Sequence, residues 1–90
     1  MERLIVLDTE TTGIRPDEGH RIIEVGAVQI LNREITSTEF HKYIQPNRTV
    51  GDSVNIHGIT DKFLINKPQF DQISNDLLSF IEGATLVIHN

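Results

Sequence analysis

The sequence predicts an α/β fold in which a mixed β-sheet is covered by helices. Apolar runs typical of strands come first, at Arg3–Asp8, Arg21–Leu31 and Glu39–Ile44. A segment with helical periodicity follows Pro68, and another apolar strand, Thr85–His89, comes after it. A helix between two strands is the usual crossover that makes them parallel neighbours in one sheet. The predicted order is therefore strand, strand, strand, helix, strand.

The first two predicted strands are both largely apolar, and a loop separates them. Arg3–Asp8 is rich in aliphatic and β-branched residues, which predicts a buried strand. Gly13–Gly19 contains Pro16 and two glycines, which is typical of a loop. Arg21–Leu31 is mostly apolar on both faces, as expected of a central strand.

A hairpin is predicted in the middle of the chain. The polar turn at residues 32–34 separates the second strand from renewed alternation at Glu39–Ile44, and this spacing favours an antiparallel pair. Pro46 ends the third strand because proline cannot donate to a ladder. Asn47–Asn66 is irregular, with a helical turn expected around Asp52–His57.

The predicted helix follows from apolar residues that recur on one face: Phe70, Ile73, Leu77 and then Phe80 or Ile81. Asn66 is a suitable N-cap and Pro68 suits a first helical turn. Gly83 is a suitable C-terminal stop. The strand after it, Thr85–His89, is predicted to be buried.

Composition limits the chain to one small domain. It has 90 residues, of which 38% are hydrophobic, enough for one thin core. The net charge is −5, from 8 basic and 13 acidic side chains. A surface that grips nucleic acid by charge alone would be basic, so this balance argues against that mode of binding. The charge does not exclude an enzyme that holds nucleic acid through metal ions and backbone amides.

The sequence also indicates where the protein works. It contains no cysteine, which excludes disulfides and thiolate metal sites and fits a reducing compartment. The longest apolar run, Leu4–Leu7, is far too short to span a bilayer. The N-terminus lacks the long apolar region of a signal peptide. We therefore predict a cytoplasmic protein.

Two acids stand at the end of the first strand, Asp8 and Glu10. Side chains two residues apart in a strand point to the same face, so both carboxylates project together. Like charges this close repel, and a divalent cation removes the conflict. Mg²⁺ and Mn²⁺ prefer oxygen ligands of this kind. The alternative interpretation is a pair of solvated acids at a strand end.

Four blocks in this order resemble the N-terminal half of a DEDD-type 3′–5′ exonuclease: "LIVLDTETTG", "HRIIEVGAVQI", "NIHGIT" and "LVIHN". The likeness covers essentially the whole chain and is greatest to the proofreading branch of that family. It implies an RNase H-like mixed sheet, here its incomplete N-terminal portion. It also implies removal of 3′-terminal nucleotides by two Mg²⁺ or Mn²⁺ ions.

The resemblance assigns roles residue by residue. Asp8 and Glu10 match the first family motif, as catalytic and metal-binding acids, with Asp8 bridging both ions and Glu10 binding one. The other implied substrate-binding residues are Thr11, Thr12, Asp52, Ile56 and His57. The later family motifs, an aspartate soon after "HN" and a histidine five residues before an aspartate, are expected beyond Asn90. Residues 1–90 are thus expected to form the N-terminal part of a single exonuclease domain, inactive alone.

The partners follow from the same resemblance. It implies a single-stranded or frayed 3′ end of DNA as substrate, and the alpha and accessory subunits of a bacterial DNA polymerase III as protein partners. Two alternatives remain at this point. One is a non-catalytic exonuclease-like fragment or polymerase-binding module. The other is a DEDD exonuclease that trims RNA, because no residue that senses a 2′-hydroxyl is identifiable.

Several polar residues have a structural interpretation instead. Glu24 lies inside the second strand, where a carboxylate needs a partner or a place near the surface. A strand-edge acid or an ion pair with Arg21 or Lys42 is favoured over catalysis. His20 and His41 are expected to be ordinary polar positions. A zinc site is disfavoured because no two histidines have the i, i+4 spacing.

A first prediction concerns metal affinity. Asp8 and Glu10 are the acids of the family's metal site that residues 1–90 contain. With these two ligands the 90-residue chain should bind Mn²⁺ weakly, with a Kd on the order of millimolar. Isothermal titration with Mn²⁺ measures this directly. Sub-micromolar binding would contradict the view that these acids form only part of a site.

Overall fold

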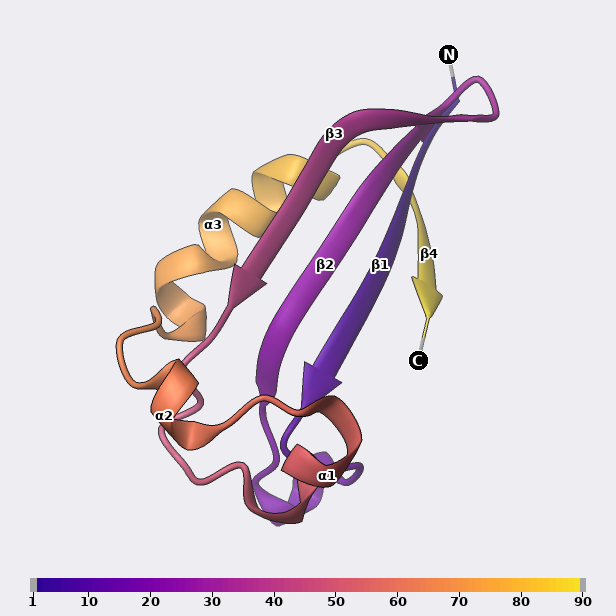
Figure 1. Cartoon of the computed structure of the whole chain (residues 1–90). Coiled ribbons are helices and arrows are strands. Elements are labelled where there is room, and N and C mark those ends of the chain that lie inside the picture. Colours follow the sequence, from indigo (N-terminus) through magenta and orange to yellow (C-terminus); the bar gives the residue numbers. More distant parts are fainter. Residues whose placement is uncertain (1, 90) are drawn as a thin grey trace.

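The computed structural model describes residues 2–89, except the side chain of Pro16, and forms one four-stranded sheet with helices (Figure 1). The strands run in the order β3-β2-β1-β4. Their bounds are Arg3–Thr11 for β1, Ile22–Leu31 for β2, Glu34–Tyr43 for β3 and Thr85–His89 for β4.

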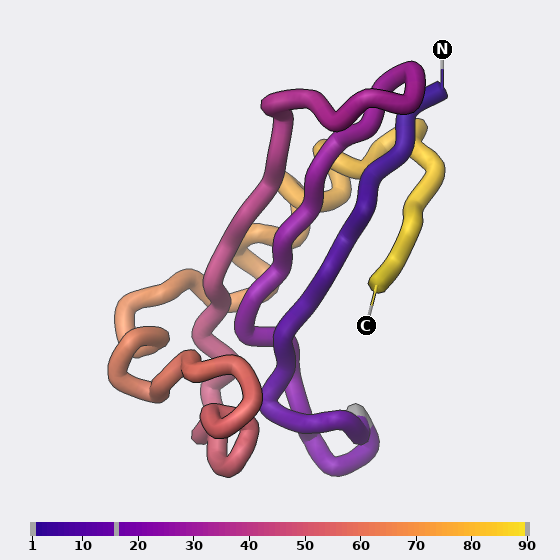
Figure 2. Tube along the Cα trace, turned by 45° about the vertical axis from the view of Figure 1, so that its right-hand side comes forward, coloured from indigo at the N-terminus to yellow at the C-terminus, as the bar shows by residue number. Residues whose placement is uncertain are grey.

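The helices are one long segment and several single turns. The long helix, α3, spans Phe70–Ile81, and it lies against one face of the sheet (Figure 2). The short elements gather at one end of the strands (Figure 1), and they are η1 at Pro16–Glu18, η2 at Gly51–Ser53, α1 at Val54–His57 and α2 at Asp61–Leu64. No helix in residues 2–89 is both long and apolar enough to cross a membrane.

The strand pairing confirms the predicted mixed sheet. β1 is antiparallel to β2, β2 is antiparallel to β3, and β4 is parallel to β1. Leu31 and Glu34 face each other across a two-residue turn, in which Asn32 has φ +51° and Arg33 has φ +70°. Positive φ at both central residues is the turn that matches the right-handed twist of paired strands.

Burial alternates along the central strand and so defines two faces of the sheet. Ile23, Val25, Ala27 and Gln29 of β2 are buried, whereas the residues between them are partly accessible. Val25 packs with Ile44 and with Ile73 of α3. We call the side that α3 covers the covered face. The opposite side, which carries the even-numbered residues of β1 and those of β2 from Glu24 onward, is called the open face.

A second part of the core holds the short helices at the end of the sheet. Ile23 packs there with Val50, Ile59 and Leu64. Thr60 caps α2, because its side chain accepts a hydrogen bond from the backbone N–H of Phe63. The predicted helical turn around Asp52–His57 is confirmed as η2 followed by α1.

The start of α3 differs from the prediction. Asn66 does not cap it; the N-cap is Gln69, whose backbone N–H donates to the side chain of Gln72 at 2.8 Å. Pro68 lies before the helix rather than in its first turn. The physical reason is that the residue before a proline disfavours helical geometry, so the helix cannot begin at Asn66. The predicted stop is confirmed, since Gly83 follows the helix with φ +76°.

The last strand is exposed, so the prediction of a buried β4 is wrong. All five of its residues are accessible, and Leu86, Val87 and Ile88 are 39%, 46% and 65% exposed. Within residues 2–89 the strand lies at the edge of the sheet beside β1, while α3 packs over β2 and β3. An apolar run is ambiguous here because an edge strand and a central strand can have the same composition.

Arg3 links the beginning of the sheet to the end of α3. Its guanidinium donates to the backbone carbonyl of Phe80 at 2.5 Å and to that of Glu82 at 3.1 Å. Its Nε donates to Oε1 of Gln29 at 2.6 Å. A cation at the C-terminal end of a helix satisfies carbonyls that have no partner within the helix and complements the helix dipole.

Two isoleucines provide a test of where the core lies. Ile23→Ala should lower the free energy of unfolding by about 2–5 kcal/mol, because Ile23 is fully buried between packed neighbours. Ile35→Ala should change it by no more than about 0.5 kcal/mol, because Ile35 is 74% exposed. Urea denaturation of both variants makes the comparison, and equal losses would contradict the assigned core.

Candidate active site

The carboxylate pair lies at the C-terminal end of β1. Asp8 and Glu10 both belong to the open face, where Asp8 faces Gly26 and Glu10 faces Glu24 across β2. The Asp8 side chain is 57% exposed. A register shift follows directly after Glu10, so the pairing changes just beyond the second acid. Local irregularities of this kind re-aim the side chains beside them.

A small cavity of about 100 Å³ lies beside these acids, lined by Asp8, Thr9, Glu10, Glu24 and Gly26. Carboxylate oxygens on one open face are the ligand type that Mg²⁺ and Mn²⁺ prefer. Within residues 2–89, however, no three aspartate, glutamate, histidine or cysteine side chains are close enough to hold a metal ion together. Asp8 and Glu10 therefore offer the ligand type that Mg²⁺ or Mn²⁺ prefers, but they supply only some of the ligands that the ion needs.

The fourth strand brings a histidine to Asp8. His89 is the register partner of Asp8 in the parallel β1–β4 pair, and its Nδ1 lies 3.8 Å from Oδ1 of Asp8. Both side chains are exposed. Asn90, the last residue of the fourth sequence block, lies outside the described residues.

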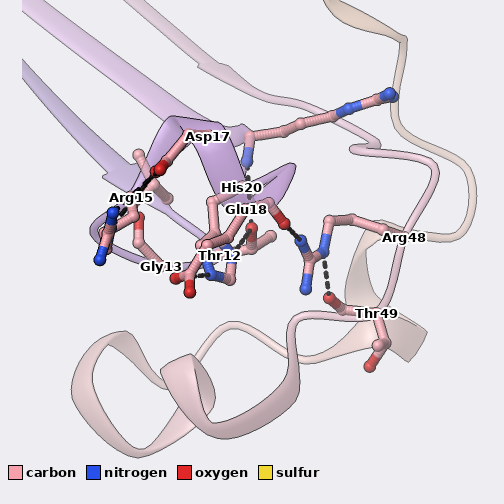
Figure 3. Close-up of polar contacts among 10 residues, drawn as sticks. Thr12, Gly13, Arg15, Asp17, Glu18, His20, Arg48 and Thr49 are labelled. Carbon is pink, nitrogen blue, oxygen red and sulfur yellow. Dashed lines mark hydrogen bonds and ion pairs between the residues drawn. The ribbon is translucent and has the colours of Figure 1, made fainter.

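The loop after β1 is held by hydrogen bonds that Thr11 and Thr12 make. Figure 3 shows Thr12 beside His20 in this loop. The Thr11 hydroxyl donates to the carbonyl of Gly13 at 2.7 Å. The buried Thr12 hydroxyl accepts from the backbone N–H of Arg21 at 3.0 Å. Its own hydrogen is then available to Nδ1 of His20, 3.0 Å away. The Thr12 side chain is thus used within the protein and shapes the loop.

Gly13 leaves the space that His20 occupies. A Cβ atom built on Gly13 would overlap the His20 ring. The backbone of Gly13 therefore packs directly under the ring, and the ring reaches Thr12 from this position. The sequence predicts an ordinary polar position for His20, and no local pattern indicates its role in closing this loop.

Three of the predicted substrate-binding residues line one larger cavity of about 550 Å³: Thr12, Asp52 and Ile56. The cavity lies between the loop after β1 and the η2–α1 segment. Arg48 also lines it, and its guanidinium donates to the carbonyls of Thr49 at 3.1 Å and Glu18 at 3.5 Å (Figure 3). Asp8 and Glu10 are not in the lining, so the acids and this cavity are separate parts of the candidate site.

His57 has both ring nitrogens in use. Nδ1 accepts from the backbone N–H of Ile59 at 2.9 Å, which places the proton on Nε2. Nε2 then donates to Oγ of Ser53, also at 2.9 Å, and Ser53 donates to the carbonyl of Val50. This chain fixes the η2–α1 turn that carries Asp52 and Ile56.

The ion pair predicted for Glu24 has a different partner. Oε2 of Glu24 lies 2.6 Å from Nε2 of His41, not near Arg21 or Lys42. Lys42 faces Val25 in the β2–β3 register and so belongs to the covered face, while the Arg21 guanidinium donates to the carbonyl of Pro46. The Glu24 charge also raises the pKa of Tyr43, and desolvation and a hydrogen bond to Glu24 add to the effect.

The mixed sheet of order β3-β2-β1-β4 with a helix on one face is the N-terminal portion of an RNase H-like α/β fold, as its likeness to the solved exonuclease structures described below shows. The exonuclease family model (RNase T) matches residues 5–90, and the chain belongs to this family.

Curated relatives agree with this assignment. DNA polymerase III subunit epsilon of Buchnera aphidicola is 51% identical, covering 99% of this chain and 40% of the relative. The subunit from Rickettsia typhi is 52% identical, with coverage of 98% and 39%. The subunit from Escherichia coli is 48% identical, with coverage of 98% and 38%. The chain thus spans about 40% of the length of the curated relatives it matches.

Solved structures show the same architecture. Exonuclease X, in complex with a 5′ overhanging duplex DNA, superposes with a TM-score of 0.75 at 26% identity, over 97% of this chain and 48% of its own. Cell-death related nuclease 4 has a TM-score of 0.77 at 24% identity, over 98% of this chain and 34% of its own. The second likeness concerns the fold alone.

The packing of Gly13 under His20 is testable. Gly13→Ala should destabilise the fold by about 1–3 kcal/mol, because the added methyl group forces the ring from its place. Gly26→Ala is the matched control, since the nearest atom to its Cβ would be 3.9 Å away, an ordinary contact. Thermal unfolding compares the two variants. A Gly13→Ala protein as stable as the control would show that the ring moves aside freely.

Proposed function

We propose that residues 1–90 are the N-terminal part of a single exonuclease domain, and that the whole protein is a proofreading 3′–5′ exonuclease. The single observation that carries the proposal is the placement of Asp8 and Glu10. They share the open face at the end of β1 in a chain that belongs to the exonuclease family. The high identity to DNA polymerase III epsilon subunits supports the proofreading type.

The two acids are the residues of this chain that would hold Mg²⁺ or Mn²⁺. Two such ions, when bound, activate water and stabilise the leaving oxygen in hydrolysis of a phosphodiester. Asp8 and Glu10 themselves supply fixed negative charge on a rigid strand, which positions the ligand oxygens with little loss of side-chain freedom. In our proposal the remaining ligands and the general base come from outside residues 1–90.

The larger cavity is the proposed place for the terminal nucleotide. Ile56 offers an exposed aliphatic surface there, suitable for contact with a base, and Asp52 offers acceptor oxygens. Gly13 also lines this cavity, and Thr11 lines a second cavity that shares Gly13 with it, so we assign both residues to the same substrate. Thr12 and His57 contribute by fixing the two walls, because their polar atoms are used in internal hydrogen bonds.

The substrate and partners follow the proofreading assignment. We propose a single-stranded or frayed 3′ end of DNA as substrate, and the alpha and accessory subunits of a DNA polymerase III as partners, in the cytoplasm. The names of the curated relatives and the DNA in the exonuclease X complex support this choice. Parallel assays with matched DNA and RNA oligonucleotides decide between DNA proofreading and RNA trimming.

A mutation tests the catalytic proposal. In the whole protein, Asp8→Asn should lower the rate of release of 3′-terminal nucleotides at least about 100-fold, because an oxygen ligand and its charge are lost. Asp76→Asn, an exposed acid on α3, is the matched control and should leave the rate unchanged. The measurement is release from a 3′-labelled single-stranded oligonucleotide with Mg²⁺ or Mn²⁺. Full activity in the Asp8→Asn protein would refute the proposal.

A further inference from the structure

A third carboxylate stands beside the proposed metal-binding acids on the open face. Glu24 of β2 is the direct register partner of Glu10 and lines the same small cavity as Asp8 and Glu10. Like charges that face each other across two strands are destabilising. A carboxylate on this face would become an additional oxygen ligand for a cation at Asp8 and Glu10 if its side chain turned toward them.

The structure turns the Glu24 side chain toward β3 instead. Nε2 of His41 donates to Oε2 of Glu24, because a carboxylate can only accept, and the two atoms are 2.6 Å apart. His41 is the register partner of Gly26, which lies two residues from Glu24 on the same face, so the contact runs diagonally across the β2–β3 pair. Such diagonal neighbours on one face are within reach of long side chains.

The surroundings keep His41 in this orientation. The Tyr43 ring meets the His41 ring edge-on, with centroids 4.9 Å apart, and meets Phe63 in the same manner at 4.7 Å. Gly26 has no side chain between Asp8 and His41, and a cavity of about 280 Å³ lies there, lined by all three. His41 is therefore separated from Asp8 by space, while it is braced against Glu24.

We propose that His41 is a positioning residue that holds Glu24 away from the carboxylate pair, so that only Asp8 and Glu10 engage a cation at this site. The inference rests on the proposed function, because it assigns His41 a role toward the metal that Asp8 and Glu10 would hold. Tyr43 supports His41 through the edge-on contact. The Glu24 carboxylate then stays bound to His41 and does not coordinate the cation.

Binding of Mn²⁺ to the 90-residue chain tests the idea without any assay of activity. Free Mn²⁺ is measured by electron paramagnetic resonance, which works at millimolar affinity. His41→Ala should bind Mn²⁺ about fivefold more tightly than the unaltered chain, because loss of the His41 hydrogen bond lets Glu24 join the site. The double variant His41→Ala/Glu24→Gln should lose this gain. His41→Gln should behave like the unaltered chain, since its amide can donate to Glu24 from the same place.

The outcomes separate a positioning role from a purely structural one. A structural role alone predicts lower thermal stability in His41→Ala with an unchanged or weaker affinity for Mn²⁺, and that result would overturn the inference. If His41→Ala does not fold, His41→Thr replaces it, because threonine suits a strand and its hydroxyl is too short to reach Glu24.

Asp8→Asn distinguishes this inference from the function on which it rests. If Asp8→Asn leaves Mn²⁺ binding unchanged, the proposed metal site itself is wrong, and the inference falls with it. If Asp8→Asn weakens binding while His41→Ala leaves it unchanged, only the role of His41 is wrong.

Discussion

The antiparallel register between β1 and β2 is the constraint on which the candidate site depends. Side chains alternate between the two faces of a sheet, and burial of Ile23 and Val25 fixes the face that β2 turns toward α3. Glu24 must then lie on the open face, and the register carries Glu10 to the same side. A slip by one residue would place the acids of β1 on the covered face, which the apolar core forbids. Burial of apolar side chains on the covered face thus determines which carboxylates lie on the open face.

The site combines parts that are positioned by different means. The carboxylates of Asp8 and Glu10 are positioned by the backbone pairing of β1 with β2. The larger cavity depends on loops, and these are fixed by side chains that bond to the backbone, as Thr12 bonds to Arg21 and His57 to Ile59. Buried or half-buried polar groups are costly unless satisfied, so each such bond favours one loop conformation. The residues that would touch a nucleotide and those that hold the walls are therefore different residues.

The sequence was sufficient for features that depend on period or on local turn chemistry. The mixed sheet, the hairpin and the helix over residues 70–81 follow from such patterns, and so does the shared face of Asp8 and Glu10. The sequence was insufficient where a neighbour distant in the chain decides. Glu24 pairs with His41, 17 residues away, because the β3 register places His41 on the open face and Lys42 on the other. The exposure of β4 likewise depends on where α3 packs, which composition does not encode. The roles of Thr11, Thr12, Asp52, Ile56 and His57 toward a substrate came from family resemblance alone and stay predictions.

The parallel pairing of β4 with β1 has a consequence for the order in which the molecule assembles. β1, β2 and β3 are joined by short connections, so their ladders form between segments that are near in the chain. The β1–β4 ladder instead joins Leu4 to Thr85, and the entropy of closing so long a loop must be overcome before the contacts form. That ladder also brings His89 to Asp8. We therefore expect the surroundings of Asp8 to be completed late in folding, after pairing with β2 has already fixed the strand that carries it.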